Sequence, residues 1–183
     1  MKLLAVVGMS GTGKSVVTDY LSENGWEKIY FGGITYKLME EAGIERDIEG
    51  KNEKKFREDL RKEHGPECYA KLSEPDIRKA LKKHNVVLDG LYSWDEYVVL
   101  KEKLGDKLTM VAVIADRKLR YDRLAIREVR PLTHEEALNR DIAEIENLAK
   151  GGPIVIADYY VLNNFTKEDY IERLKEIINR IEE

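Results

Sequence analysis

Short apolar segments alternate along the chain with longer segments that carry apolar residues at helical spacing. Leu3–Val7 is apolar throughout, which is typical of a strand covered on both faces. Further strands are predicted at Trp26–Phe31, Asn85–Gly90, Leu108–Ala115 and Pro153–Asp158. Because these predicted strands alternate with helices at the spacing of βαβ units, the pattern predicts an α/β fold with a parallel, doubly wound sheet.

Capping signals locate the predicted helices. The first helix is expected to run from Lys14 to about Asn24, and Gly25 ends it. Gly32-Gly33 is expected to break the second strand before a helix over Ile34–Ala42. Later helices are expected after caps at Ser93, Thr133 and Thr166. Thr133 opens a capping box, and the helix that follows it is expected to extend to about Lys150.

The stretch from residue 44 to residue 63 is nearly all charged, with Phe56 and Leu60 as rare apolar anchors. Pro66 and Pro75 then punctuate two more helices. Most of these charges, taken singly, fit a solvated helix pair. The length of 183 residues fits one domain, 1–183, with a small inserted lid.

Composition narrows the class of protein. The chain is 43% hydrophobic and 36% charged with a formal net charge of −4, which gives no bulk attraction to nucleic acid or membrane. Its one cysteine, Cys68, cannot form an internal disulfide and suits a reducing cytoplasm. The N-terminus lacks a signal-peptide pattern and its apolar run is too short to span a bilayer. The absence of glutamine and the load of ion-pairing residues indicate a thermophilic source.

The first predicted strand leads into a phosphate-binding loop. The residues Gly8, Met9, Ser10, Gly11, Thr12, Gly13, Lys14 and Ser15 satisfy the pattern G-x-x-x-x-G-K-[ST]. Glycines let successive backbone N–H groups point at phosphate oxygens, and the following helix adds its positive N-terminal end. Lys14 is expected to reach the β- and γ-phosphates and the Ser15 hydroxyl to bind Mg²⁺. The loop therefore predicts binding of ATP or GTP.

Asp89 ends the third apolar run and precedes Gly90. A carboxylate at a strand end beside a phosphate loop can hold Mg²⁺, directly or through water. An Asp-Gly pair is also a frequent turn. Next to a phosphate loop the magnesium role is favoured.

Arginines recur through the segment after the fourth predicted strand. They are Arg117, Arg120, Arg123, Arg127 and Arg130, and on a helix this spacing would place most of them along one stripe. Guanidinium groups neutralise the charge that develops in phosphoryl transfer. Arg123 and Arg127 are the preferred pair, with Arg140 as a third candidate. The alternative is a helix edge whose arginines pair with Asp122, Glu128 and Glu135.

These motifs occur in an order similar to that in small-molecule P-loop kinases. With the "VVLDG", "DRKLRYDRLAIR", "NRD" and "IADYYVLNN" segments, the chain resembles the nucleoside monophosphate kinase and dephospho-CoA kinase group, and most of all a poorly characterised archaeal branch of it. The resemblance implies a five-stranded sheet in the order 2-3-1-4-5. It also implies an acceptor-binding region at 32–72, a lid at 117–140, and a purine near the loop from Asp158 to Asn164.

The chain departs from this group just after the second strand. Members are expected to carry an aspartate there, whereas this chain has Phe31-Gly32-Gly33. A hydroxyl acceptor needs a base, but a phosphate acceptor is already an anionic nucleophile. The difference argues mildly against a dephospho-CoA kinase. The carboxylates of Asp47, Glu58 and Asp59 remain open as sources of a base.

Arg57 and Arg61 lie one helical turn apart and could clasp an acceptor phosphate. Ion pairs with the neighbouring carboxylates on a solvent-exposed helix would explain these two arginines equally well. The leading hypothesis is an ATP- and Mg²⁺-dependent kinase with a small phosphorylated acceptor such as a nucleotide. The alternatives are transfer to a hydroxyl and a nucleotide-binding regulatory protein that hydrolyses slowly. No basic patch interleaved with aromatic residues is seen outside the lid, which disfavours nucleic-acid processing.

Overall fold

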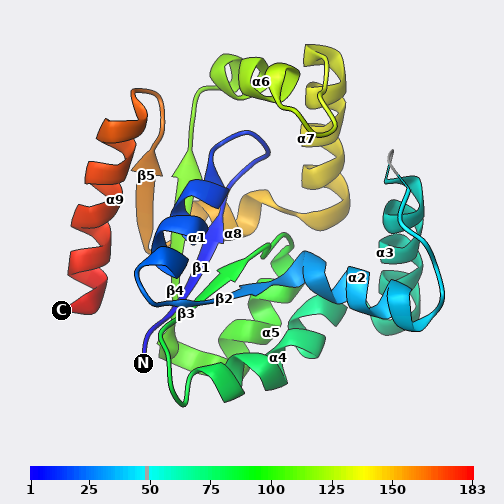
Figure 1. Ribbon diagram of the computed structural model, residues 1–183, viewed down its shortest axis with the longest axis horizontal. Helices are drawn as coiled ribbons and strands as arrows, with labels where there is room; N and C mark the ends of the chain where they lie inside the picture. Colours follow the sequence, from blue (N-terminus) through cyan, green and yellow to red (C-terminus); the bar gives the residue numbers. More distant parts are fainter. Residues whose placement is uncertain (48–49) are drawn as a thin grey trace.

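A five-stranded sheet lies at the centre of the computed structural model, which describes residues 1–47 and 50–183 (Figure 1). All neighbouring strands are parallel and follow the order β2-β3-β1-β4-β5. The predicted doubly wound sheet in the order 2-3-1-4-5 is therefore confirmed. The strands are β1 Leu3–Val7, β2 Glu27–Tyr30, β3 Val86–Asp89, β4 Leu108–Ile114 and β5 Tyr159–Leu162.

The central strand β1 is buried along its whole length, as its unbroken apolar sequence predicts. It pairs with β3 on one side and β4 on the other, and the register sets Val6 opposite Asp89. The carboxyl end of β3 therefore lies beside the residues that follow Val7. This pairing brings two segments about 80 residues apart in the sequence to one edge of the sheet.

Helices cover both faces of the sheet (Figure 1). Alternate β1 residues divide between two cores. Leu4 and Val6 pack with the helices α1 and α9, whereas Leu3 and Ala5 pack with α4 and α5. The helices of these layers are α1 Lys14–Glu23, α9 Lys167–Glu182, α4 Cys68–Ala80 and α5 Trp94–Leu104, the last followed by the 3₁₀ turn Gly105–Lys107.

Two further pairs of helices project from these layers (Figure 1). α2 Phe31–Glu41 and α3 Lys51–His64 lie in the predicted acceptor-binding region, here called the insert, and α6 Arg117–Ile126 and α7 His134–Leu148 include the predicted lid, whose name is kept for both helices. Residues 48 and 49 of the predicted 32–72 region lie outside the described residues. In the part of the chain that is described, no helix is long and apolar enough to cross a bilayer.

The prediction of a strand at Pro153–Asp158 is wrong. The segment begins with the short helix α8 Gly151–Val155, and the fifth strand starts only at Tyr159. Val155 is 74% exposed, while Val161 in β5 is fully buried. An apolar run of this length has no periodicity that separates a strand from a helical turn, so tertiary packing decides between them.

Two further boundaries differ from the sequence prediction. The second strand ends at Tyr30, close to the predicted break, but the helix begins at Phe31, so Gly32 and Gly33 lie in the first turn of α2. A Cβ atom on Gly32 would lie 2.3 Å from the hydroxyl of Tyr30, so the glycine makes room for that ring. The arginine-rich helix ends at Ile126, and Arg127 is already extended. Arg127 and Arg130 therefore do not continue the stripe of α6.

The corrected position of the fifth strand predicts opposite effects for two valines. Val161→Ala should lower the free energy of unfolding by about 2 kcal/mol, because it removes buried methyl groups and leaves a cavity. Val155→Ala, at an exposed position, should change it by less than about 0.5 kcal/mol. Urea unfolding of the two variants would measure both values. Equal destabilisation would contradict the placement of β5.

Candidate functional site

The glycine loop between β1 and α1 has the backbone that a phosphate cradle requires. Gly8, Gly11 and Gly13 have φ angles of 145°, 81° and 95°. A Cβ atom on Gly8 would lie 2.4 Å from the carbonyl oxygen of Val113, and one on Gly13 would lie 2.4 Å from the amide nitrogen of Asn163. Both conformation and space therefore demand glycine. The backbone can turn its N–H groups toward one centre as a result.

The start of α1 is left open for an anion. Its N-cap is Gly13, and within the described residues no side chain caps this end and no acidic residue lies in its first turn. The first N–H groups of a helix have no partner inside the helix and carry its positive dipole end. An oxyanion is the ligand that suits them.

Lys14 reaches back across the loop. Its Nζ donates to the carbonyl oxygens of Gly8, at 2.8 Å, and of Met9, at 3.0 Å. Burial, and next the positive charge of Lys150, lower the pKa of Lys14 to about 7, although Glu144 acts in the opposite direction. Anionic phosphates would favour the charged form and raise this pKa.

Side chains from the far end of the sheet brace the loop. The amide of Asn163 donates to the carbonyl oxygen of Thr12 at 2.8 Å, and the hydroxyl of Tyr170 donates to that of Gly13 at 3.0 Å. Asn164, which was predicted to lie near the purine, accepts the backbone N–H of Asp116 at 2.9 Å, and its role at the nucleotide stays a prediction. The residue that contacts the loop is its neighbour Asn163. Sequence reasoning missed it because adjacent asparagines carry no signal of which one faces inward.

Asp89 lies at the edge of this site. Its Oδ2 accepts from the hydroxyl of Thr18 at 3.3 Å and from Nζ of Lys28 at 3.0 Å. Thr18 also contacts the carbonyl oxygen of Ser15 at 3.2 Å, so the two predicted magnesium ligands share a neighbour. Hard oxygen donors of this kind fit Mg²⁺, which keeps several waters and takes its other ligands from phosphates. Among the described residues no group of three or more His, Cys, Asp or Glu side chains could hold a metal by itself.

Arg120 has a structural role that the sequence did not predict. It is buried, and its guanidinium donates to both carboxylate oxygens of Asp141, at 3.1 and 2.5 Å, and to the carbonyl oxygen of Ser10, at 2.8 Å. The hydroxyl of Tyr121 donates to the same carboxylate at 3.0 Å. A bidentate buried pair therefore joins α6 to α7 and ties both lid helices to the loop.

The two preferred lid arginines lie in different environments. Arg123 donates to Oδ1 of Asn163 at 3.2 Å, which places it against the brace of the loop. Arg127 donates to the carbonyl oxygen of Arg130 at 2.5 Å, and burial followed by its basic neighbours lowers its pKa. Arg130 in turn pairs with Glu53 of α3 at 2.8 Å, which links lid to insert. Arg123 and Arg127 both remain predicted phosphate ligands.

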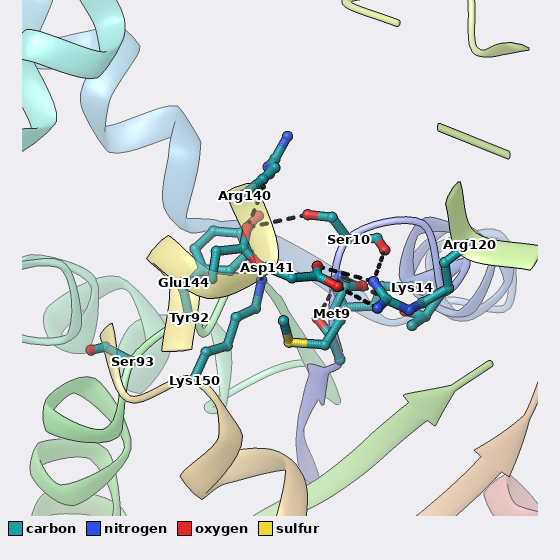
Figure 2. A network of polar contacts seen from close by, with 12 residues as sticks. Met9, Ser10, Lys14, Tyr92, Ser93, Arg120, Arg140, Asp141, Glu144 and Lys150 are labelled. Atoms are coloured by element: carbon teal, nitrogen blue, oxygen red, sulfur yellow. Dashed lines mark hydrogen bonds and ion pairs between the residues drawn. The ribbon is translucent and has the colours of Figure 1, made fainter. Parts of the chain in front are cut away.

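A second cluster lies beside the loop and includes residues that sequence reasoning did not select. Figure 2 shows Glu144 of α7 between the loop and a lysine that follows the helix. The Glu144 carboxylate accepts from Ser10 Oγ at 3.1 Å, from Arg140 Nε at 3.1 Å and from Lys150 Nζ at 2.6 Å. The third of these donors, Lys150, had been predicted only as the end of a helix.

The two arginines predicted to bind an acceptor, Arg57 and Arg61, differ in their surroundings. Arg61 pairs with the buried carboxylate of Glu96 at 3.2 Å and lies 4.8 Å from the ring centroid of Tyr69. Arg57 is half-buried, and its charge acts on Tyr30 and Tyr69, so it lies near both. Within residues 1–47 and 50–183 no ion pair to Arg57 is seen. Of this pair, Arg57 is the one without a carboxylate partner among the described residues, and its acceptor role stays a prediction.

Of the three carboxylates considered as bases, one is engaged by backbone N–H groups and two are exposed. Asp47 caps α3 by accepting the backbone N–H groups of Lys51 and Asn52, and these bonds hold its pKa below the usual range. The side chains of Glu58 and Asp59 are each 56% exposed. The site offers no clear base from this helix among the described residues.

Comparisons of sequence place the chain among known proteins. The family model described as an AAA domain matches residues 4–147. A UPF0200 protein of Thermococcus onnurineus is 30% identical over 98% of this chain and 97% of its own length. A UPF0200 protein of Sulfurisphaera tokodaii is 32% identical over 99% of this chain and 98% of its own length.

Comparisons of structure identify the fold. A dephospho-CoA kinase from Campylobacter jejuni has a TM-score of 0.63 and 18% identity, and the match covers 99% of this chain and 98% of that one. A shikimate kinase from Bacteroides thetaiotaomicron has a TM-score of 0.59 and 13% identity over 100% and 99% of the two chains. At such identities the likeness establishes the fold, which is that of P-loop kinases.

The lowered pKa of Lys14 predicts that replacing this lysine stabilises the ligand-free protein. Lys14→Met should raise the free energy of unfolding by about 1–3 kcal/mol at pH 6.5, because a pKa below the unfolded value of 10.5 disfavours the charged form on folding. The cost of the wild-type lysine is complete below pH 7 and declines as the pH rises toward 10.5. Urea unfolding at pH 6.5 and pH 9.5 should show the advantage of the variant shrinking. An advantage that grows with pH would contradict the lowered pKa.

Proposed function

This chain belongs to the UPF0200 family and has the fold of P-loop kinases, and from that premise we propose that it is an ATP-dependent phosphotransferase. In this proposal it transfers the γ-phosphoryl group to a small phosphorylated acceptor such as a nucleotide. The supporting observation is Lys14, held across a glycine loop whose following helix start is capped by no side chain from the described part of the chain. A helix end, converging amides and one ammonium are suited to a triphosphate.

The residues of the chain divide the work of transfer. The loop and Lys14 would bind and orient the β- and γ-phosphates, and Arg123 and Arg127 would approach them from the lid. Ser15 and Asp89 would hold Mg²⁺, which would supply positive charge to neutralise the phosphate oxygens. Lys28, which pairs with Asp89 at 3.0 Å, would keep that carboxylate oriented.

The acceptor side favours a phosphate over a hydroxyl group. The side chains of Glu58 and Asp59 are exposed, which makes them poor candidates for a base, whereas Arg57 is half-buried near Tyr30. A phosphate acceptor needs positioning and neutralisation, and a guanidinium group supplies both. Transfer to a hydroxyl, as in dephospho-CoA kinases, would require Asp89 or a carboxylate of the insert to act as the base.

Transfer of labelled phosphate from ATP or GTP to a panel of nucleoside monophosphates and dephospho-CoA tests the proposal. Label in a nucleotide acceptor supports it, and label in dephospho-CoA supports the hydroxyl alternative. Release of inorganic phosphate alone would favour a slowly hydrolysing regulatory protein. Lys14→Ala should reduce transfer by at least about 100-fold, since it removes the cation that would neutralise the transferred phosphoryl group. Lys175→Ala, at an exposed position of α9, is the matched control and should keep wild-type activity.

Nucleotide binding should take up protons above neutral pH. Lys14 has a pKa of about 7 before binding, and phosphate oxygens raise it, so the bound state carries a proton that the free state has partly lost. Affinity for Mg-ADP should therefore fall as the pH rises from 7 to 9. Calorimetry in two buffers with different ionisation enthalpies measures the uptake directly. The Lys14→Arg variant, which cannot lose its proton, should show none of it.

A further inference from the structure

We propose that Lys150 is a second phosphate-binding lysine of this site and that Glu144 is a resident carboxylate in the place of a phosphoryl group. The inference rests on the proposed function and deepens it. On triphosphate binding, phosphate oxygens would replace the Glu144 oxygens around Lys150. Glu144 would thereby lower the affinity for the triphosphate, because it must be displaced from Lys150. Lys150 would raise that affinity, because it contacts the phosphate in the complex.

The position of the Glu144–Lys150 pair identifies which phosphate is concerned. Lys14 reaches the β- and γ-phosphates in loops of this kind, so its Nζ marks that end of the site. Glu144 and Lys150 are the two side chains whose charges act most strongly on Lys14. The Glu144 carboxylate also touches the loop itself, since it accepts the hydroxyl of Ser10 at 3.1 Å (Figure 2). The pair therefore lies at the end where the γ-phosphoryl group would bind.

The donors around Glu144 are those that a phosphate accepts. A hydroxyl from the loop, a guanidinium nitrogen of Arg140 and the ammonium of Lys150 converge on its two oxygens. Charged nitrogen donors and hydroxyls make the strong contacts in phosphate sites. Glu144 thus satisfies donors that a phosphoryl group could satisfy equally well.

The local charge leaves room for an added anion. Asp141 is paired with Arg120, and Asp89 is paired with Lys28. Three cations, Lys14, Arg140 and Lys150, then face the single carboxylate of Glu144. The surplus positive charge, partly removed from water, is the condition under which a polyanion gains most from binding.

Lys150 is held in place by its backbone and its surroundings. It is only 2% exposed, and its Nζ lies 4.8 Å from the ring centroid of Tyr92. Ala149, in the left-handed conformation with φ 46°, ends α7, and the N–H of Lys150 donates back to the carbonyl oxygen of Glu144 at 3.3 Å. A buried lysine fixed in this way is preorganised, and a buried ion pair adds little stability for its own sake.

The test compares triphosphate with diphosphate affinity in four variants. We would titrate wild type, Lys150→Met, Lys150→Arg, Glu144→Gln and the double variant Glu144→Gln/Lys150→Met with a Mg²⁺-bound non-hydrolysable ATP analogue and with Mg-ADP. Lys150→Met should lose about tenfold or more in affinity for the triphosphate and less than about threefold for the diphosphate. Lys150→Arg, which keeps the charge, should recover part of the loss.

The Glu144 variants separate phosphate binding from mere neutralisation of a buried carboxylate. If Lys150 binds the γ-phosphoryl group, Glu144→Gln gains triphosphate affinity and the double variant remains as impaired as Lys150→Met. If Lys150 only balances Glu144, the double variant regains the wild-type ratio of triphosphate to diphosphate affinity, and the inference is overturned.

Two controls keep the outcomes distinct. Circular dichroism and thermal unfolding verify that each variant is folded, and if Lys150→Met is not, Glu144→Gln alone decides, because no gain in triphosphate affinity would overturn the inference. Wild-type protein that binds no nucleotide would instead defeat the proposed function. Wild-type binding and transfer together with an unchanged ratio in Lys150→Met would defeat the inference alone.

Discussion

The site depends on the positive charge of Lys14, which the fold removes from water and holds over the backbone of the glycine loop. Its ammonium donates to two carbonyl oxygens, but burial first, and then repulsion by Lys150, lower its pKa to about 7. An anion that binds beside it would stabilise its charged form. The fold thus accepts a local cost in stability where ligand binding would return it.

The rest of the structure keeps that loop in one shape. β1 fixes where the loop starts, and Asn163 and Tyr170 hold its carbonyl groups from the far side of the sheet. Arg120 holds the loop from the lid, because its guanidinium donates hydrogen bonds both to Asp141 and to the loop carbonyl oxygen of Ser10. The loop is therefore preorganised by contacts from three separate parts of the chain, which reduces what binding must order.

Several arginines of the lid and the insert are held in ion pairs within the protein. Of the basic residues on these elements, Arg120 and Arg61 are committed to buried carboxylates, and Arg130 joins lid and insert through Glu53. Arg57 and Arg127 are not held by carboxylates among the described residues. A charge that already has a buried partner serves architecture, whereas one without such a partner can serve a ligand.

The sequence by itself determined the parallel sheet, its strand order through the family resemblance, the glycine loop and the capped helices, because these follow from local periodicity, turn chemistry and motif spacing. It could not decide whether Pro153–Asp158 is a strand or which of Asn163 and Asn164 faces the loop. Nor could it foresee that Lys150 lies against Glu144 beside Ser10, 140 residues away in the chain. Such choices depend on which side chains share a buried volume, and only tertiary packing brings those partners together.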